Sequence, residues 1–355
     1  MTWPLAARKF PARRLRRPSV PGRSAGGWFA PVVLLLLPGA CRVDRQGIAD
    51  IDATADPEAG AETAAVDGGA PGDDAGACVM KEPPSRWATW PMPVVGMTDY
   101  DVGTPGVVVD RVTHLTWERD VAAESFTWAE AGARCACLDL AGHDDWRLPT
   151  RIELVSLIDV TRQSPAIDRT AFPDTPSEWF WTSSPAADDP VSAWYVAFFD
   201  GDTHHMDQAT AYHVRCVRSE PSPTGAPTPA EPTVVRDDGT VLDVATGLTW
   251  QRAPDPTPRT WSEAAAACAG LPVDSQPGDA RPWRLPDVKE LQTLIDESRA
   301  DPAIDPVAFP DTPSESFWAS TPLAGQPGFA WFVSFHNGVA YNSQVEAPHR
   351  VRCVR

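Results

Sequence analysis

One hairpin concentrates side chains that bind transition metals. The segment Asp200-Gly-Asp202-Thr-His204-His205-Met-Asp207 contains two adjacent histidines and three aspartates. Imidazole suits zinc, nickel and copper, and carboxylates complete many such sites, so Asp202, His204 and His205 are candidate metal ligands. Neighbouring strand residues point to opposite faces of a sheet, which argues against the two histidines as joint ligands. A solvated hairpin tip is the alternative.

The elements that position this hairpin belong to a block of sequence that occurs twice. Each copy contains Leu-Thr-Trp, Trp-Arg-Leu-Pro, Phe-Pro-Asp-Thr-Pro-Ser-Glu and a closing Val-Arg-Cys-Val-Arg. We therefore predict two domains, copy one at residues 84–218 and copy two at residues 234–355. The segment 219–233 between them contains five prolines, which favours a semi-rigid spacer. We expect the two copies to fold as independent domains.

Each copy is predicted to be α+β, with two helices followed by hairpin strands. Thr127 with Glu130, and Thr150 with Glu153, have the spacing of helix-capping boxes, and copy two repeats both spacings. Aromatic and β-branched runs then indicate strands, and Asp200-Gly201 and Asn337-Gly338 are hairpin-turn pairs. The shared Trp residues are expected to pack in the two cores.

The cysteines allow either disulfides or thiol chemistry. Comparison of the copies matches Cys135 with Cys268 and Cys216 with Cys353. We therefore predict the disulfides Cys135–Cys216 and Cys268–Cys353, and a Cys78–Cys137 bond between the two cysteines left over. The alternative is a metal or redox site, but Cys135-Ala-Cys137 lacks the two-residue gap typical of such motifs.

Other candidate ligand contacts differ between the copies. Trp179 has no aromatic counterpart in copy two, and an exposed Trp can stack on a sugar ring or cap a domain edge. Asn337 and Tyr341 lie in the copy-two hairpin that matches the His204-His205 hairpin.

Recurring Asp and Arg residues indicate a structural network of ion pairs and loop caps. A carboxylate-lined calcium site is the alternative. These residues are Asp159/Asp296, Asp168/Asp305, Asp174/Asp311, Arg147/Arg284 and Arg215/Arg352.

The chain begins with a predicted export signal at residues 1–40. A basic stretch precedes an apolar run at 28–37, which is too short to span a membrane. Leu-Leu-Pro-Gly-Ala-Cys41 resembles a bacterial lipobox, which predicts lipidation of Cys41 and a membrane-anchored lipoprotein on the outer membrane or periplasmic face. Residues 41–83 are predicted to be a disordered acidic tether, because Gln46–Ala77 holds eight acidic residues and no basic ones.

Charge narrows the classes of partner. The signal carries seven basic residues and no acidic one, so its removal lowers the net charge from −18 to −25. A chain this acidic is repelled by phosphate backbones, which argues against nucleic acids. Sulfated polysaccharides are disfavoured for the same reason.

The shared motifs together resemble the Lcl C-terminal domain family, named for the C-terminal domain of the Legionella collagen-like adhesin. The resemblance covers both copies. It implies a C-type-lectin-like fold, related to that of formylglycine-generating enzymes, with a disulfide from the first helix to the last strand. It also implies binding of an extracellular ligand, a polysaccharide or a surface protein.

We therefore expect a noncatalytic envelope protein with two tandem lectin-like domains and no cofactor other than a possible calcium ion. No nucleophile, metalloprotease or nucleotide-binding motif appears in the sequence. Two alternatives stay open, a thiol-dependent enzyme acting through Cys135 or Cys137 and a structural envelope component. The sequence does not determine the oligomeric state.

Overall fold

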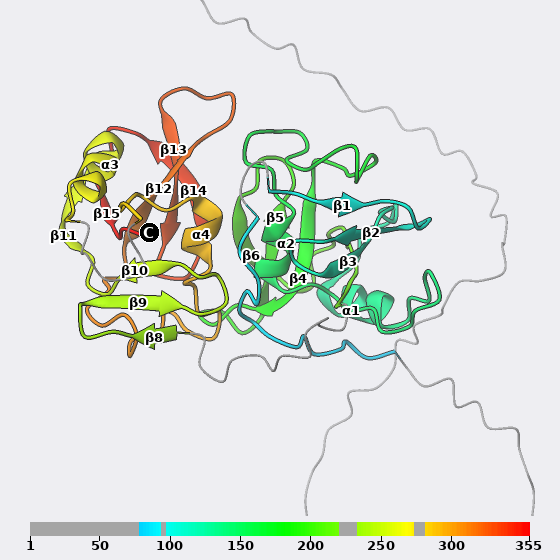
Figure 1. Ribbon diagram of the computed structural model, residues 1–355. Helices are drawn as coiled ribbons and strands as arrows, with labels where there is room; N and C mark the ends of the chain where they lie inside the picture. The colour runs from blue at the N-terminus through cyan, green and yellow to red at the C-terminus, as the bar shows by residue number, and fades with distance from the viewer. Residues whose placement is uncertain (1–77, 94–96, 220–232, 273–280) are drawn as a thin grey trace, which may run out of the picture. The chain divides into compact units, whose positions relative to one another are not determined.

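The computed structural model describes residues 78–93, 97–219, 233–272 and 281–355 (Figure 1). The predicted signal, Cys41, most of the tether and most of the proline-rich spacer lie outside these residues. Every helix in the described part of the chain is too short or too polar to span a bilayer.

The two copies have similar orders of elements, but copy two has an additional strand before its first helix (Figure 1). Copy one contains β1 (Tyr100–Asp101), β2 (Val107–Asp110), β3 (Leu115–Glu118), α1 (Trp128–Ala136), α2 (Arg151–Ser156), β4 (Trp179–Pro185), β5 (Ser192–Ala197), β6 (Thr203–Asp207) and β7 (Val217–Ser219). Copy two contains β8 (Thr233–Val235), β9 (Thr240–Asp243), β10 (Thr249–Gln251), β11 (Asp255–Arg259), α3 (Trp261–Ala269), α4 (Val288–Gln292), β12 (Ser316–Pro322), β13 (Phe329–Ser334), β14 (Ala340–Gln344) and β15 (His349–Val351). Two helices and mainly antiparallel strands in each copy agree with the predicted α+β class.

Local sequence determines where the four helices begin. Thr127, Thr150, Thr260 and Asp287 are the N-caps, and each forms a capping box with the Glu three residues later. The second helix of copy one is short. α2 ends at Ser156, all six of its residues are buried, and Leu157 and Ile158 follow it.

All three predicted disulfides are present. Cys135–Cys216 and Cys268–Cys353 join the first helix of each copy to its C-terminal segment, with Cα atoms 5.4 and 5.5 Å apart. Each lies in its own apolar cluster. Cys78–Cys137 joins the leading segment, residues 78–93, to the end of α1. The six described cysteines are therefore all bridged, and neither Cys135 nor Cys137 is a free thiol.

Beside its disulfide, copy one has an ion pair where copy two has a neutral contact. In copy one Glu118 accepts the Cys216 N–H (3.1 Å) and also two hydrogen bonds from Arg134 (2.9 and 2.5 Å). In copy two Gln251 accepts the Cys353 N–H (2.9 Å), and Ala267 stands where copy one has Arg134. The neutral amide does the same backbone bonding without a charge, so it needs no cation.

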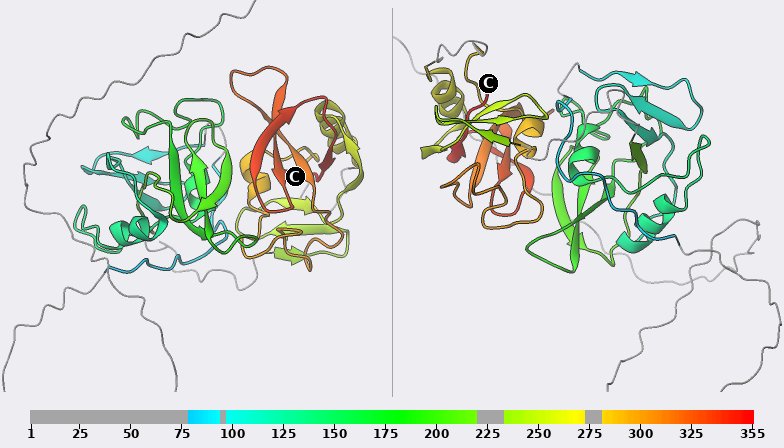
Figure 2. Two further views of the ribbon diagram at one scale, coloured as in Figure 1. Left: turned by 180° about the vertical axis from the view of Figure 1, so that it is seen from behind. Right: turned by 60° about the horizontal axis from the view of Figure 1, so that its bottom comes forward.

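The two copies do not fold independently, contrary to our expectation. One sheet of eight strands crosses both, in the order β11-β15-β12-β13-β14-β6-β5-β4, and one apolar cluster draws residues from both. The sheet is joined where Thr203 on β6 pairs with Ala340 on β14. These are equivalent positions of the two copies in antiparallel pairing, so a local twofold relation passes through this point. Figure 2 shows the two copies from two further directions.

The segment before copy one also belongs to the folded unit. We assigned residues 41–83 to the tether, but Cys78 is bridged and Met80 packs against Gly132 on α1. Farther along, Trp90 and Met92 are buried in the shared apolar cluster. The tether assignment is therefore wrong for its last residues. A fragment starting at residue 84 would lose a disulfide.

Candidate functional site

A row of aromatic side chains lies on one face of the shared sheet. In copy one, Tyr195 on β5 pairs with His204 on β6, and their rings are stacked 6.2 Å apart. Tyr212 packs edge-on against Tyr195 at 5.2 Å. Residues directly opposite each other in an antiparallel pair lie on the same face, so Tyr195 and His204 share a face. The ring contacts then give the order Tyr212, Tyr195, His204 across the sheet.

Copy two continues the row with the equivalent residues. Tyr341 on β14 pairs with Phe332 on β13, with ring centres 6.4 Å apart, and His349 lies 5.0 Å from Phe332. The local twofold relation places the two triplets next to each other at the β6–β14 junction. We call the six residues Tyr212, Tyr195, His204, Tyr341, Phe332 and His349 the aromatic row. The strands β5, β6, β14 and β13 carry its centre over about 14 Å, at about 4.8 Å per strand.

Asp202 lies in the middle of this row. The antiparallel pairing of Thr203 with Ala340 sets Asp202 opposite Tyr341, on the same face. Burial raises the pKa of Asp202 to about 7, and the charge of Asp200 raises it further. Its Oδ1 is buried without a hydrogen-bond partner among the described residues. Burial also raises the pKa of Tyr195, with Asp202 the next largest cause. The row therefore combines rings with a carboxyl group of which one oxygen has no hydrogen-bond partner in the described part of the chain.

Exposure differs along the row. His204 is exposed, and Tyr341 has 49% of its surface exposed, whereas Tyr195 is buried and the other three residues are half-buried. A ligand could thus contact the rings on both sides of the junction. Asp202 has Val339 as its copy-two equivalent, so the polar character of the junction comes from copy one.

The structure does not support the predicted metal site. The Nδ1 atom of His204 accepts the His205 N–H (2.9 Å), and Nε2 of His205 lies 3.7 Å from Asp188. The two imidazole rings lie 5.0 Å apart, but His205 packs against Trp194 and His204 stacks on Tyr195, so each ring has an aromatic partner of its own. Among the described residues, no three His, Cys, Asp or Glu side chains converge to hold a metal ion. This applies equally to the calcium alternative.

The remaining predicted contacts are partly in place. Trp179 is 44% exposed and its ring lies 5.7 Å from Tyr212, so it extends the row at the copy-one end. Tyr341 belongs to the row itself. Asn337 does not, because it lies in the hairpin turn, where its Oδ1 accepts the Val339 N–H (3.4 Å).

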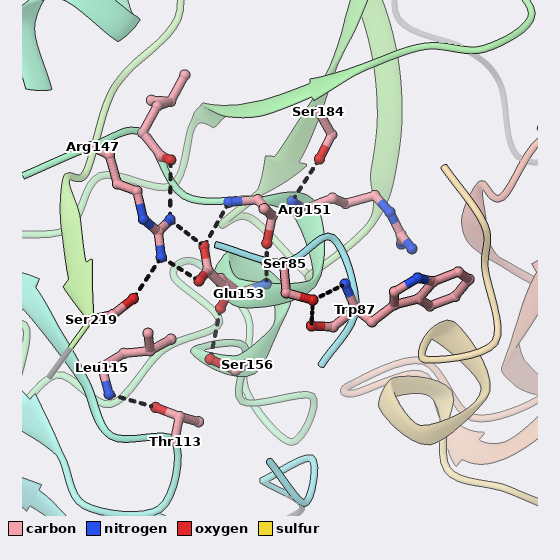
Figure 3. A network of polar contacts seen from close by, with 12 residues as sticks. Ser85, Trp87, Thr113, Leu115, Arg147, Arg151, Glu153, Ser156, Ser184 and Ser219 are labelled. Atoms are coloured by element: carbon pink, nitrogen blue, oxygen red, sulfur yellow. Dashed lines mark hydrogen bonds and ion pairs between the residues drawn. The ribbon is translucent and has the colours of Figure 1, made fainter. Parts of the chain in front are cut away.

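The recurring Arg and Asp residues form a structural network, as predicted. Arg147 donates two hydrogen bonds to Glu153 and one to Ser219 (Figure 3). Arg215 donates to two backbone carbonyls and to Thr175, beneath the ring of Phe172. Arg284 and Arg352 repeat both arrangements in copy two. The aspartates mainly accept backbone N–H groups of their own loops, as Asp168 does from Thr170 (2.7 Å).

The sequence did not predict the charged contacts between the copies. Arg151 on α2 donates to Glu297 (2.9 Å) and to the side chain of Gln292 (2.7 Å) across the junction. Both ions are almost completely buried, and the guanidinium lies 5.3 Å from the Trp194 ring. Figure 3 shows Arg151 extending away from the copy-one network. The equivalent positions are Val288 and Val160. A charged residue in one copy at a position that is apolar in the other copy was the sequence pattern that could have predicted this contact.

Comparison with known families agrees with this duplication. The Lcl C-terminal domain model matches residues 106–218 and again residues 239–355. The chain belongs to the Lcl C-terminal domain family. The matched residues cover more than half of the chain and include all of the motifs that repeat. No curated protein matches the chain.

Proposed function

We propose that this Lcl-family chain is an exported, envelope-attached protein that binds a carbohydrate without catalysis, through the aromatic row. The row is the observation that supports this function. Aromatic faces pack against the C–H faces of sugar rings, while a few polar groups orient the ligand through their hydroxyls. Asp202 and His204 supply such groups between the rings.

The family and the sequence support the surface location. Membership in a family named for an adhesin domain is consistent with a surface role, and the predicted signal and lipobox at Cys41 would place the chain there. The C-type-lectin-like fold implied by the sequence resemblance belongs to the same proposal. The acidity of the chain and the carboxyl group in the row favour an uncharged glycan over a sulfated one.

The disulfides bear on the enzyme alternative. A thiol-dependent enzyme needs a nucleophilic thiolate, but Cys135 and Cys137 are each joined to another cysteine. The thiol hypothesis therefore has no nucleophile among the residues that suggested it.

A glycan array probed with the purified full chain tests the proposal. We expect retention on uncharged glycans, and about tenfold weaker binding by Tyr341→Ala and by His204→Ala, because each truncation removes exposed contact area at the centre of the site. Val307→Ala is the matched control, since Val307 is 75% exposed and lies outside the row. Absence of any retained glycan, or equal binding by all of these variants, would contradict the proposal. Retention of only a protein partner would also contradict it.

A further inference from the structure

Each copy has a pocket at the end of its second helix, and the two pockets occupy equivalent positions. The copy-one pocket has a volume of about 260 Å³ and the copy-two pocket about 280 Å³. Both are lined by an equivalent set of a leucine, two aspartates and an arginine. In copy one these are Leu157, Asp159, Asp168 and Arg162, and in copy two Leu294, Asp296, Asp305 and Arg299.

The copy-one pocket already holds an ammonium group. Lys289 of copy two lines it, and its Nζ donates to the carbonyl oxygens of Ser156 (3.0 Å) and Ile158 (2.7 Å). Lys289 is buried, with 4% of its surface exposed. The carbonyl groups at the end of α2 thus bind a primary ammonium at the edge of an acidic pocket.

The copy-two pocket has the same acidic lining without that lysine. The residue equivalent to Lys289 is Ile152, which does not line this pocket, so this position supplies no ammonium to the carbonyl groups at the end of α4. Asp243 adds a third carboxylate; it is buried and lines the pocket. Arg299 is the one cation in the lining, and it is paired with Asp296 (2.8 Å).

An aromatic wall completes the copy-two pocket. Trp87 and Phe309 line it together with Leu294. Trp87 comes from the leading segment, where its N–H donates to Ser85 Oγ (3.0 Å) and its carbonyl accepts from the same hydroxyl (3.1 Å) (Figure 3). Aromatic faces beside carboxylates attract cations through the ring quadrupole as well as through charge.

From this geometry we infer that the copy-two pocket binds a small cationic ligand, an amino sugar or similar primary amine, whose ammonium takes the place that Lys289 fills in copy one. The carbonyl groups of Thr293 and Ile295 are equivalent to the two that accept Lys289 in copy one. The carboxylates of Asp243 and Asp305 and the ring of Trp87 line the same pocket. This site is separate from the aromatic row and does not depend on the function proposed for it.

Isothermal titration calorimetry on the purified full chain tests the inference, with glucosamine as the probe. N-acetylglucosamine and glucose are matched ligands without the positive charge, and we expect each to bind at least tenfold more weakly. Ethanolamine separates the two ligand classes. Binding as tight as that of glucosamine indicates a general amine site, and weaker binding indicates an amino-sugar site. Either result supports the inference.

Two equivalent aspartates supply the matched variants. Asp305→Asn is expected to weaken glucosamine binding about tenfold, because it removes a charge-assisted contact. The amide oxygen can still accept the Val307 N–H that Asp305 accepts now (2.8 Å), so the loop is kept. Asp168→Asn makes the equivalent change in the copy-one pocket, which Lys289 lines, and it should leave glucosamine binding unchanged.

The remaining outcomes separate this site from the aromatic row. Tyr341→Ala should leave glucosamine binding intact, and Asp305→Asn should leave glycan-array binding intact, so either proposal can fail without the other. No heat of binding with glucosamine, equal affinity for N-acetylglucosamine, or equal losses in Asp305→Asn and Asp168→Asn would overturn the inference.

Discussion

The buried ion pair between Arg151 and Glu297 tests whether the two copies form one cooperative unit. Both side chains are almost fully excluded from solvent, with 1% and 3% exposed. Replacing Glu297 by Met leaves a buried guanidinium without its anion, which typically costs 3–5 kcal/mol. Gln292 still accepts from Arg151, and the Trp194 ring still faces it. We therefore expect Glu297→Met to lower the free energy of unfolding by about 3 kcal/mol, the lower end of that range.

The double variant Arg151→Met/Glu297→Met completes the cycle. Removing both charges with side chains of similar volume is often neutral or stabilising, so the double variant should be more stable than Glu297→Met alone. Its new costs are the side-chain and backbone oxygens of Gln292, which lose their donor, and the lost contact of the guanidinium with the Trp194 ring. The equivalent positions already show that this site accepts apolar residues, because Val288 and Val160 stand there and both belong to the shared apolar cluster.

Urea unfolding followed by circular dichroism and tryptophan fluorescence measures these free energies. Both signals should change in one transition, because the copies share a sheet and an apolar cluster. Arg162→Met is the control, because Arg162 is 48% and its partner Asp159 22% exposed, and a pair this accessible to solvent should contribute less than about 1 kcal/mol. A cost for Glu297→Met no larger than that of the control would refute the reasoning. Two separate transitions would refute the single unit.

Three further results follow from the same structure. Arg134→Ala should lower the free energy of unfolding by about 2 kcal/mol, because it strands the buried Glu118 carboxylate; adding Glu118→Gln, the arrangement of copy two, should restore most of it in urea titrations. Cys78→Ser should free the leading segment and weaken glucosamine binding several-fold, while N-acetylglucosamine serves as the calorimetric baseline; unchanged affinity would show that the disulfide does not hold Trp87 in place. Burial lowers the pKa of Lys289 from 10.5 to about 8, so the unfolded chain holds this proton more tightly than the folded one. The free energy of unfolding of the wild-type chain relative to Lys289→Met should therefore rise by about 3 kcal/mol between pH 8 and pH 10.5, and a flat or falling difference in urea titrations across that window would contradict it.

Features encoded by local sequence were predictable. The capping boxes at Thr127 and Thr150 depend on residues three positions apart, and the hairpin turns at Gly201 and Gly338 on adjacent residues. The disulfides were within reach because two copies on one chain show which cysteines correspond. In each case the physical cause lies inside one copy, so it appears in the sequence twice.

Features that depend on how the two copies meet were not predictable. The metal hypothesis for the His204-His205 hairpin failed because neighbouring side chains on β6 have separate partners. The aromatic row exists because Thr203 pairs with Ala340, more than a hundred residues later in the chain, and no periodicity within one copy encodes that pairing. The substitutions Arg151 for Val288 and Glu297 for Val160 marked the junction in the sequence, but only the folded chain shows that they pair.

The sequence by itself thus determined the duplication, the family, the disulfides and the helix starts, because these follow from short-range patterns or from comparing the copies. The tertiary structure decided which residues share a surface. It joined the copies into one sheet, placed Asp202 among the rings, brought Trp87 to the copy-two pocket and set Lys289 in the wall of the copy-one pocket. The physical reason is that apolar surface is buried wherever it fits, whatever its distance along the chain, and polar groups at such junctions must then find partners there.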